Sequence, residues 1–144
     1  MIAIDTNLLV YAHRPESPAH DAAREVLAEL AGGGGAWAIP FHCLIEFSGV
    51  VTHPRVWRQP SSAKQVGAQL DAWLSAPTVR VLTEDAAMLP GFVTAMGGAK
   101  VGGGAVHDAR IAACCRFHGV KELWSADRDY LRYPWLKVRN PLVG

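Results

Sequence analysis

The feature that most constrains the fold is the alternation of short, apolar, strand-like runs with longer segments of helical pattern. The five strand-like runs are residues 1–4, 36–39, 78–82, 122–125 and 137–140. Strands that alternate with helices pair in parallel, because each connecting helix returns the chain to the same end of the sheet. The sequence therefore predicts an α/β fold with a central, mainly parallel sheet covered on both faces.

The first helical segments carry clear start and stop signals. Ser17-Pro18 begins a helix over 19–31, which the glycines at 32–35 end. A helical segment then follows Pro40 to about residue 53. Ser61 or Ser62 caps a further helix through residue 76, and the side chains that this helix is expected to bury are Val66, Leu70, Trp73 and Leu74.

Two more helices are predicted around a glycine-rich stretch in the second half of the chain. Thr83-Glu84-Asp85 caps a helix that Pro90 shortens or kinks. Residues 97–104 contain five glycines and predict a mobile loop. The last helix, over 105–118, ends at Gly119.

Length and composition are those of one globular domain, expected over residues 1–144. The chain is 50% hydrophobic and 19% charged, which excludes intrinsic disorder. Three cysteines, with Cys114 and Cys115 adjacent, form no disulfide framework and indicate a reducing compartment. No run is long and apolar enough to cross a membrane, and no secretory signal precedes the first strand. We therefore expect a soluble, cytoplasmic protein.

The net charge of +1 combines 14 basic with 13 acidic residues. If four of the acids gather in one internal site, the rest of the molecule carries 14 basic against nine acidic residues. A basic exterior around an acidic site suits a polyanion whose phosphates meet metal ions.

Four carboxylates stand at unusual places in this pattern. Asp5 and Asp127 come just after strands, Asp127 at the start of a predicted turn over 127–131, and ligands bind beyond the carboxyl ends of parallel strands. Asp108 and Glu46 lie on helix faces whose neighbours are mostly apolar. Because an unpaired buried carboxylate costs several kcal/mol, four converging acids predict a cation between them.

Each acid also has a separate structural interpretation. Asp5 could cap a helix that starts near Leu8, Asp108 could favour the first turn of its helix, and Glu46 could pair with an arginine.

The donor atoms near the four acids indicate which cation would bind. Thr6, Asn7 and Ser125 offer only oxygen and amide groups, which together with carboxylates predict Mg²⁺ or Mn²⁺. The six histidines and three cysteines show no zinc-ligand spacing.

Several other activities lack their motifs. Lys100 is followed by Val101, so the glycine-rich stretch is not a phosphate-binding loop. No Gly-x-Ser-x-Gly motif supports a serine hydrolase. Asp5 has no acidic partner beside it, which argues against a phosphoacceptor receiver domain.

The ordered set of motifs resembles PIN-domain ribonucleases, and most of all VapC-type toxins of bacterial toxin–antitoxin pairs. The matching segments are the opening Met-Ile-Ala-Ile-Asp5-Thr6-Asn7-Leu-Leu-Val-Tyr, Glu46 on the helix after the second strand, His107-Asp108-Ala109-Arg110-Ile111-Ala112-Ala113, and Leu123-Trp124-Ser125-Ala126-Asp127-Arg128-Asp129-Tyr130. The resemblance covers essentially the whole chain and implies a three-layer α/β/α sandwich.

By this resemblance, Asp5, Glu46, Asp108 and Asp127 form an acidic quartet that binds Mg²⁺ or Mn²⁺. Ser125 takes the place of a threonine or serine near the site, and Asp129 joins through a water. Tyr130 stands where phenylalanine is common. The family also implies a homodimer and a cognate antitoxin that inserts a peptide into the acidic cleft.

The resulting expectation is a toxin that hydrolyses RNA with a metal-activated water and inhibits translation and growth. The alternative is a catalytically silent PIN-fold module that sequesters RNA or a protein partner. The residues expected to contact RNA phosphates, with simple solvated charge as their alternative, are Arg110, Arg14, Lys100 and Arg128.

Overall fold

Five parallel strands form one sheet in the computed structural model, which describes residues 1–143. Their order across the sheet is β3-β2-β1-β4-β5. Ile2 of β1 lies opposite Trp37 of β2 on one side and Glu122 of β4 on the other. All five predicted strands are present, and their bounds are β1 (Ile2–Ile4), β2 (Trp37–Pro40), β3 (Val79–Leu82), β4 (Glu122–Trp124) and β5 (Lys137–Arg139).

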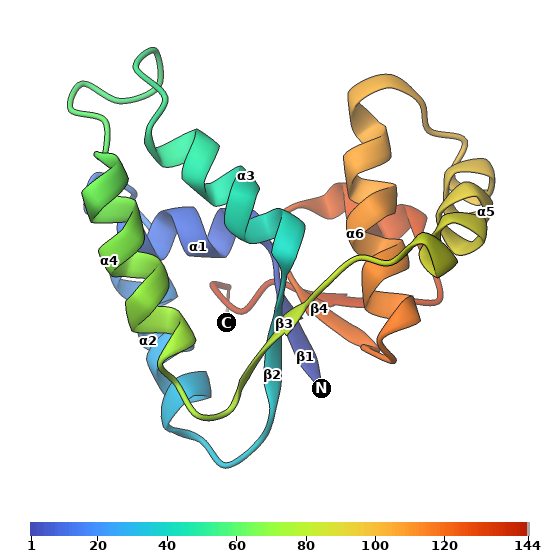
Figure 1. Cartoon of the computed structure of the whole chain (residues 1–144), viewed down its shortest axis with the longest axis horizontal. Helices are drawn as coiled ribbons and strands as arrows, with labels where there is room; N and C mark the ends of the chain where they lie inside the picture. The colour runs from blue at the N-terminus through green and yellow to red at the C-terminus, as the bar shows by residue number, and fades with distance from the viewer. Residues whose placement is uncertain (144) are drawn as a thin grey trace.

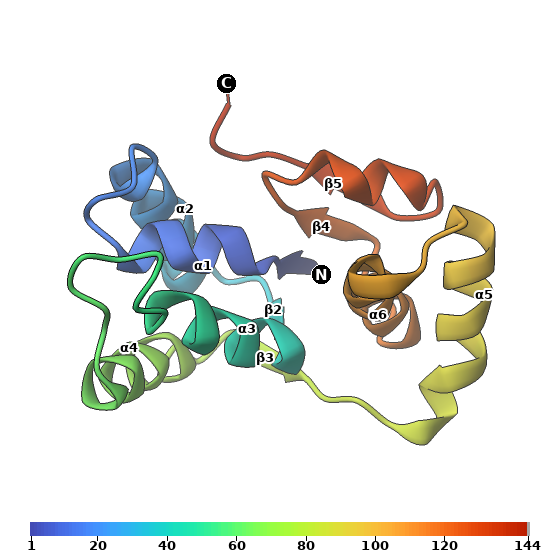
Figure 2. The ribbon, with the colours of Figure 1, turned by 90° about the horizontal axis from the view of Figure 1, so that it is seen from above.

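Helices cover both faces of the sheet, so the predicted three-layer α/β/α sandwich is confirmed. The helices are α1 (Thr6–His13), α2 (His20–Gly32), α3 (Phe41–Val51), α4 (Ala63–Leu74), α5 (Leu89–Ala99) and α6 (Val106–Phe117). From β1 the chain moves outward to β2 and β3, then returns past β1 to β4. Because such crossovers are right-handed, this reversal sends α5 and α6 to the face opposite α1–α4, as Figures 1 and 2 show.

The reversal of strand order also determines where a ligand can bind. It occurs between β1 and β4, and in open α/β sheets the crevice lies beyond the carboxyl ends of the two strands at this point. Residues 5–7 follow β1 and residues 125–127 follow β4. The polar residues predicted at the two strand ends are therefore neighbours in space.

The core lies between the sheet and the helices on each face. Ile4, Ile39 and Leu123 of the central strands are fully buried, as is Phe47 of α3. The adjacent Cys114 and Cys115 are buried in this core.

The first helix begins earlier than the sequence indicates. Asp5 is the N-cap of α1, which starts at Thr6 directly after the strand rather than near Leu8. The polar triplet Asp5-Thr6-Asn7 therefore contains a helix start, and the strand-to-helix transition takes a single residue.

The prediction of a mobile loop over residues 97–104 is wrong for its first half. Helix α5 continues through Gly97 and Gly98 to Ala99, and the chain then turns at Lys100, whose φ is 55°. Packing of α5 against α6 outweighs the low helix propensity of glycine. Pro90 lies in the first turn of α5, where its missing N–H has no helical partner to lose, and α5 begins at Leu89 rather than directly after the predicted cap at 83–85.

Smaller differences occur at three other elements. Helix α4 ends at Leu74, and this side chain is 40% exposed rather than buried as predicted, whereas Val66 is buried. Asp85 caps a short 3₁₀ turn, Ala86–Met88, and the predicted turn after Asp127 is a 3₁₀ helix, Arg128–Arg132. Among residues 1–143, no helix combines the length and apolar character that a membrane crossing needs.

Candidate active site

Asp5 lies at the carboxyl end of the central strand, and only 4% of it is exposed. As N-cap of α1 it accepts a hydrogen bond on Oδ1 from the Thr6 backbone N–H at 2.8 Å. Ser125, which follows β4, donates from Oγ to the other oxygen, Oδ2, at 2.6 Å. The buried carboxylate is thus fixed from two neighbouring strands.

Three longer contacts also reach Asp5. Asn7 donates from Nδ2 to Oδ2 at 3.3 Å, and the Tyr130 hydroxyl donates to Oδ1 at 3.3 Å. The Cys43 thiol lies 3.8 Å from Oδ1, and burial raises its pKa well above the ordinary value, so it keeps its proton. Sequence reasoning missed Tyr130 and Cys43 as partners of Asp5.

Burial dominates the electrostatics of this carboxyl group. Removal from water raises the pKa of Asp5 from 3.8 to about 6. The hydrogen bonds from Ser125 and Thr6 act against this shift, and the negative charge of Glu46 adds to it. A carboxylate that is costly to ionise without a cation nearby gains more from a bound cation than an exposed one does.

A hydrogen-bond network connects the ends of β1 and β4. Asn7 donates to Ser125 Oγ at 3.2 Å and accepts from the Ala126 backbone N–H on Oδ1 at 3.2 Å. The Asp127 backbone N–H donates to Ser125 Oγ at 3.0 Å. Asn7 and Ser125 therefore hold the segment that carries Asp127 beside Asp5.

The closest grouping of acids contains Asp108, Asp127 and Asp129. One carboxylate oxygen from each lies within 4.8 Å of the others. Burial raises the pKa of Asp108, and the negative charges of Asp127 and Asp129 raise it further. Asp129 thus belongs to the same acidic cluster as Asp108 and Asp127.

One cavity of about 310 Å³ brings the four acids of the predicted quartet together. Its lining combines them with polar and aromatic side chains from α1 and the segment after β4: Asp5, Thr6, Asn7, Tyr11, Glu46, Asp108, Asp127 and Tyr130. Ser125 is buried and lies behind Asp5 rather than on the cavity wall. The fold therefore brings these acids together from four separate segments of the chain.

The separate structural interpretations hold only in part. Asp5 does cap α1, and Asp108 lies in the first turn of α6. Glu46 contacts a histidine rather than an arginine, since His42 Nε2 lies 3.7 Å from Glu46 Oε2. With 39% of its side chain exposed, Glu46 stands at the open side of the cavity.

The donors around this cavity suit a hard divalent cation. Carboxylate and hydroxyl oxygens are the ligands that Mg²⁺ and Mn²⁺ prefer. Thr6 Oγ1 is buried at the cavity wall and has no hydrogen-bond partner within residues 1–143. A buried hydroxyl with a free lone pair beside clustered carboxylates fits a site that a metal and its water shell complete.

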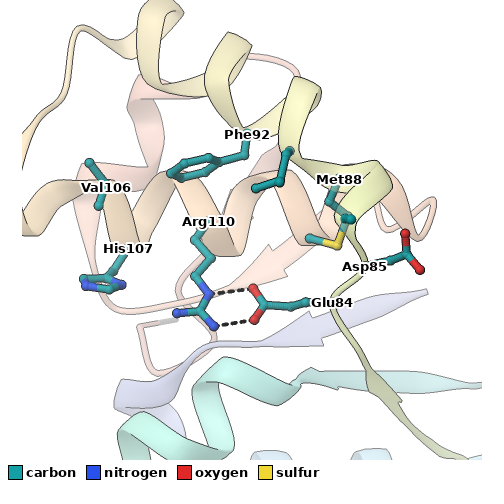
Figure 3. A pocket seen from close by; sticks show the side chains of 9 residues that line it. Glu84, Asp85, Met88, Phe92, Val106, His107 and Arg110 are labelled. Atoms are coloured by element: carbon teal, nitrogen blue, oxygen red, sulfur yellow. Dashed lines mark hydrogen bonds and ion pairs between the residues drawn. The ribbon is translucent and has the colours of Figure 1, made fainter.

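Two of the four expected RNA contacts are instead engaged within the protein. Arg14 is 6% exposed and pairs with Glu16, which leaves little of its side chain accessible to RNA. Arg110 forms a two-pronged ion pair with Glu84, drawn in Figure 3, and this pairing makes it a poor phosphate ligand. Lys100 and Arg128 are exposed and remain available.

A second cavity, of about 490 Å³, lies between α5, α6 and the turn that follows β3, as Figure 3 shows. The Glu84–Arg110 pair forms part of its lining, together with apolar side chains of α5, α6 and the turn: Met88, Leu89, Phe92 and Val106. None of the quartet acids lines this cavity.

Comparison with known proteins agrees with the fold. The PIN domain family matches residues 2–136. Ribonuclease VapC43 of Mycobacterium tuberculosis is 33% identical over 144 residues, which cover 100% of this chain and 97% of the relative. The chain belongs to the PIN-domain family of VapC ribonucleases. Another such relative is Ribonuclease VapC48 of the same organism, 29% identical over 97% of both chains.

Solved structures share the PIN fold at low sequence identity. The sarcin-ricin loop cleaving toxin VapC20 of Mycobacterium tuberculosis superposes with a TM-score of 0.73 at 18% identity, over 96% of this PIN domain and 99% of the toxin. FitAcB from Neisseria gonorrhoeae superposes over the full length of both chains with a TM-score of 0.67, also at 18% identity. These proteins thus share the fold of this chain although fewer than a fifth of the residues are identical.

Proposed function

We propose that this protein is the toxin of a toxin–antitoxin pair: a metal-dependent endoribonuclease whose cleavage of RNA inhibits translation and growth. The observation that carries the proposal is the cavity at the crevice between β1 and β4, into which Asp5, Glu46, Asp108 and Asp127 converge. Membership in a family of ribonucleases supports RNA as the substrate.

The cavity residues divide into two proposed roles. Asp5 and Asp108 are the primary metal ligands, because both are withdrawn from water and both have raised pKa values that a cation would reverse. A bound Mg²⁺ or Mn²⁺ would supply activation of water and neutralisation of charge on the phosphate. Thr6, Asn7 and Ser125 keep Asp5 and the Asp127 segment in place.

Glu46 and Asp127 orient the attacking water for an in-line displacement at phosphorus. Glu46 is partly exposed at the cavity mouth, where both water and RNA have access. Asp127 accepts the backbone N–H of Asp129 on Oδ1 at 2.8 Å, which fixes its carboxylate and places Asp129 within the acidic cluster. No protein nucleophile is required, so the products carry a 5′-phosphate and a 3′-hydroxyl.

The proposed partners are a cognate antitoxin and a second copy of this chain. Solved relatives include the VapBC2 complex of Rickettsia felis and a toxin–antitoxin complex from Klebsiella pneumoniae. The excess of carboxylates in the cavity suits an antitoxin peptide that carries a basic side chain into it.

The test is to map new RNA 5′ ends in total cellular RNA after brief induction of the wild-type protein and of Asp108→Asn. Asp21→Asn, an exposed acid on α2, is the matched control. We expect 5′-phosphate ends and growth arrest with the wild type and the control, and neither with Asp108→Asn. With purified protein, Mg²⁺ or Mn²⁺ should restore cleavage after EDTA treatment.

Two results would contradict the proposal. Ends that carry 2′,3′-cyclic phosphate on the upstream fragment would mean that the RNA 2′-hydroxyl attacks without this metal chemistry. Growth arrest that persists in Asp5→Asn at equal protein levels would instead support the catalytically silent binding module.

A further inference from the structure

The connection between α3 and α4, residues 52–62, is an exposed segment whose charged side chains are all basic. No aspartate or glutamate occurs from residue 47 to residue 70, whereas this span contains Arg55, Arg58 and Lys64. All three basic side chains are exposed. Within residues 1–143, none of them has a carboxylate within ion-pair distance. We call residues 52–62 the α3–α4 arm; Figure 1 shows it extending beyond the ends of both helices.

The arm is anchored to α3 by Trp57 and Ser61. The Trp57 indole N–H donates to the Val50 carbonyl at 2.8 Å, and the Ser61 backbone N–H donates to the Val51 carbonyl at 2.9 Å. The base of the arm therefore has fixed contacts at both sides of the turn that carries Arg55 and Arg58.

Arg14, at the end of α1, forms the second anchor. Its guanidinium lies 4.3 Å from the Trp57 ring centroid and donates to the Gln59 carbonyl at 3.0 Å and to Ser61 Oγ at 3.1 Å. This buried arginine is a structural support for the arm. The accessible positive charge belongs to Arg55 and Arg58, and because their backbone is already ordered, binding through them has a smaller entropic cost.

The arm is attached where the acid-lined cavity ends. Val50, which accepts the Trp57 hydrogen bond, also lines the cavity, as does Tyr11 of α1. Glu46 and Val51 are five residues apart on α3, so the arm begins roughly 8 Å along the helix axis from this acid. A strand of RNA whose scissile phosphate lies at the acids thus has its flanking phosphates within reach of the arm.

Electrostatics favours a polyanion on this surface. The cavity contains several carboxylates and repels RNA, so substrate affinity requires positive charge outside it. Arg14 and Arg110 do not supply this charge, because both are paired internally.

We infer that the α3–α4 arm binds the phosphate backbone of the RNA strand that flanks the cleavage site, through Arg55 and Arg58. This inference rests on the proposed ribonuclease function and specifies how the substrate is held. The contacts are to phosphates, so they contribute affinity and position without reading the base sequence.

The test measures binding of a fluorescein-labelled single-stranded RNA of mixed sequence by anisotropy at several salt concentrations. All proteins carry Asp5→Asn to prevent cleavage. The arm variant is Arg55→Gln/Arg58→Gln, and the matched control is Arg24→Gln/Arg80→Gln, which removes the same charge from exposed arginines on α2 and β3.

We expect the arm variant to bind at least about tenfold more weakly at low salt. Its slope of log affinity against log salt should be shallower by about 1.4, because each lost phosphate contact on a single strand contributes about 0.7. The control should keep the parent slope, and Arg55→Lys/Arg58→Lys, which keeps the charge, should stay near it. In the cleaving background, the arm variant should raise KM and leave kcat unchanged.

Equal salt slopes for the arm variant and the parent would overturn the inference. So would unchanged RNA binding combined with weaker binding of a polyglutamate peptide, which would assign the arm to an acidic protein segment. Failure of the proposed function is seen separately, as absence of cleavage by the wild type with Mg²⁺. Cleavage by the wild type with an unaffected arm variant would reject the arm alone.

Discussion

At the scale of single residues, the site depends on one carboxyl group that the fold withdraws from water. Asp5 accepts its two shortest hydrogen bonds from Thr6 and Ser125, yet its pKa still rises to about 6. Burial therefore outweighs the donors. The protein without a cation at this site is consequently less stable when Asp5 is ionised, so this proposed metal ligand destabilises the fold until a cation binds.

This imbalance predicts a pH-dependent gain in stability for Asp5→Asn. Below about pH 4 the carboxyl is protonated in both folded and unfolded chains; as pH rises to about 6 the unfolded chain ionises first, so folding stability falls and then levels off. A rise of the Asp5 pKa from 3.8 to about 6 lowers the free energy of unfolding by about 3 kcal/mol at most. Denaturant unfolding in EDTA should show Asp5→Asn gaining on the wild type between pH 4 and 6.

The exposed-acid variant Asp21→Asn provides the control for this measurement, since it makes the same charge change on the surface of α2. A stability difference between Asp5→Asn and the wild type that stays constant over pH 4–6 would contradict the raised pKa.

The donors to Asp5 should also set the acidic limb of the activity profile. The Ser125 hydrogen bond lowers the pKa of Asp5 more than any other contact, and the Tyr130 hydroxyl lowers it less. Ser125→Ala should move the acidic limb of kcat/KM to higher pH by about one unit, and Tyr130→Phe should move it in the same direction by less. The pH–rate profiles of both variants test this order, and the reverse order would contradict it.

Some of these residues were predictable from the sequence and others were not. Asp5 and Asp127 follow strands, and this local pattern places them at one edge of a parallel sheet. Tyr130 and Cys43 are partners of Asp5 only because the fold brings distant segments together. Arg110 seemed available for RNA because its partner Glu84 is 26 residues away in sequence.

At the scale of elements, the strands and most helices follow local signals, while α5 depends on tertiary packing. Gly97 and Gly98 would end an isolated helix, but α5 packs against α6 and includes them. The number of glycines in this segment says nothing about the packing of α5 against α6, so the sequence alone could not predict that the helix continues. Helix start signals were more reliable. The sequence predicts a serine cap at Ser61 or Ser62 for α4, and in the structure Ser62 caps the helix and forms a full capping box with Gln65.

Two glycine substitutions near this boundary should have opposite effects. Gly98 lies inside α5, is exposed, and a Cβ there meets nothing within 4 Å, so Gly98→Ala should stabilise by about 0.5–1 kcal/mol. Gly103 has φ of +59°, a conformation that alanine disfavours, so Gly103→Ala should destabilise by about 1 kcal/mol. Thermal unfolding of both variants measures the two changes in stability. Changes in the same direction would show that the helix boundary is misplaced.

At the scale of the whole molecule, the two cavities lie at different places in the fold. The acid-lined cavity opens at the carboxyl ends of β1 and β4, and the basic arm lies beside it between α3 and α4. Helix α5 exposes apolar side chains next to the second cavity: Leu89 is 58% exposed and Val93 is 62% exposed.

The apolar surface of α5 is where we expect the second copy of the proposed homodimer. Exposed apolar side chains beside a cavity of about 490 Å³ are typical of a protein contact, because covering them releases water. Val93→Asp should therefore convert the dimer to a monomer in size-exclusion chromatography with light scattering. Val56→Asp makes the same change at an exposed valine of the α3–α4 arm and should leave the dimer intact. Two outcomes would contradict a dimer contact on α5. One is a monomeric wild type at 100 µM, a concentration about tenfold above a weak micromolar Kd, and the other is that both variants remain dimers.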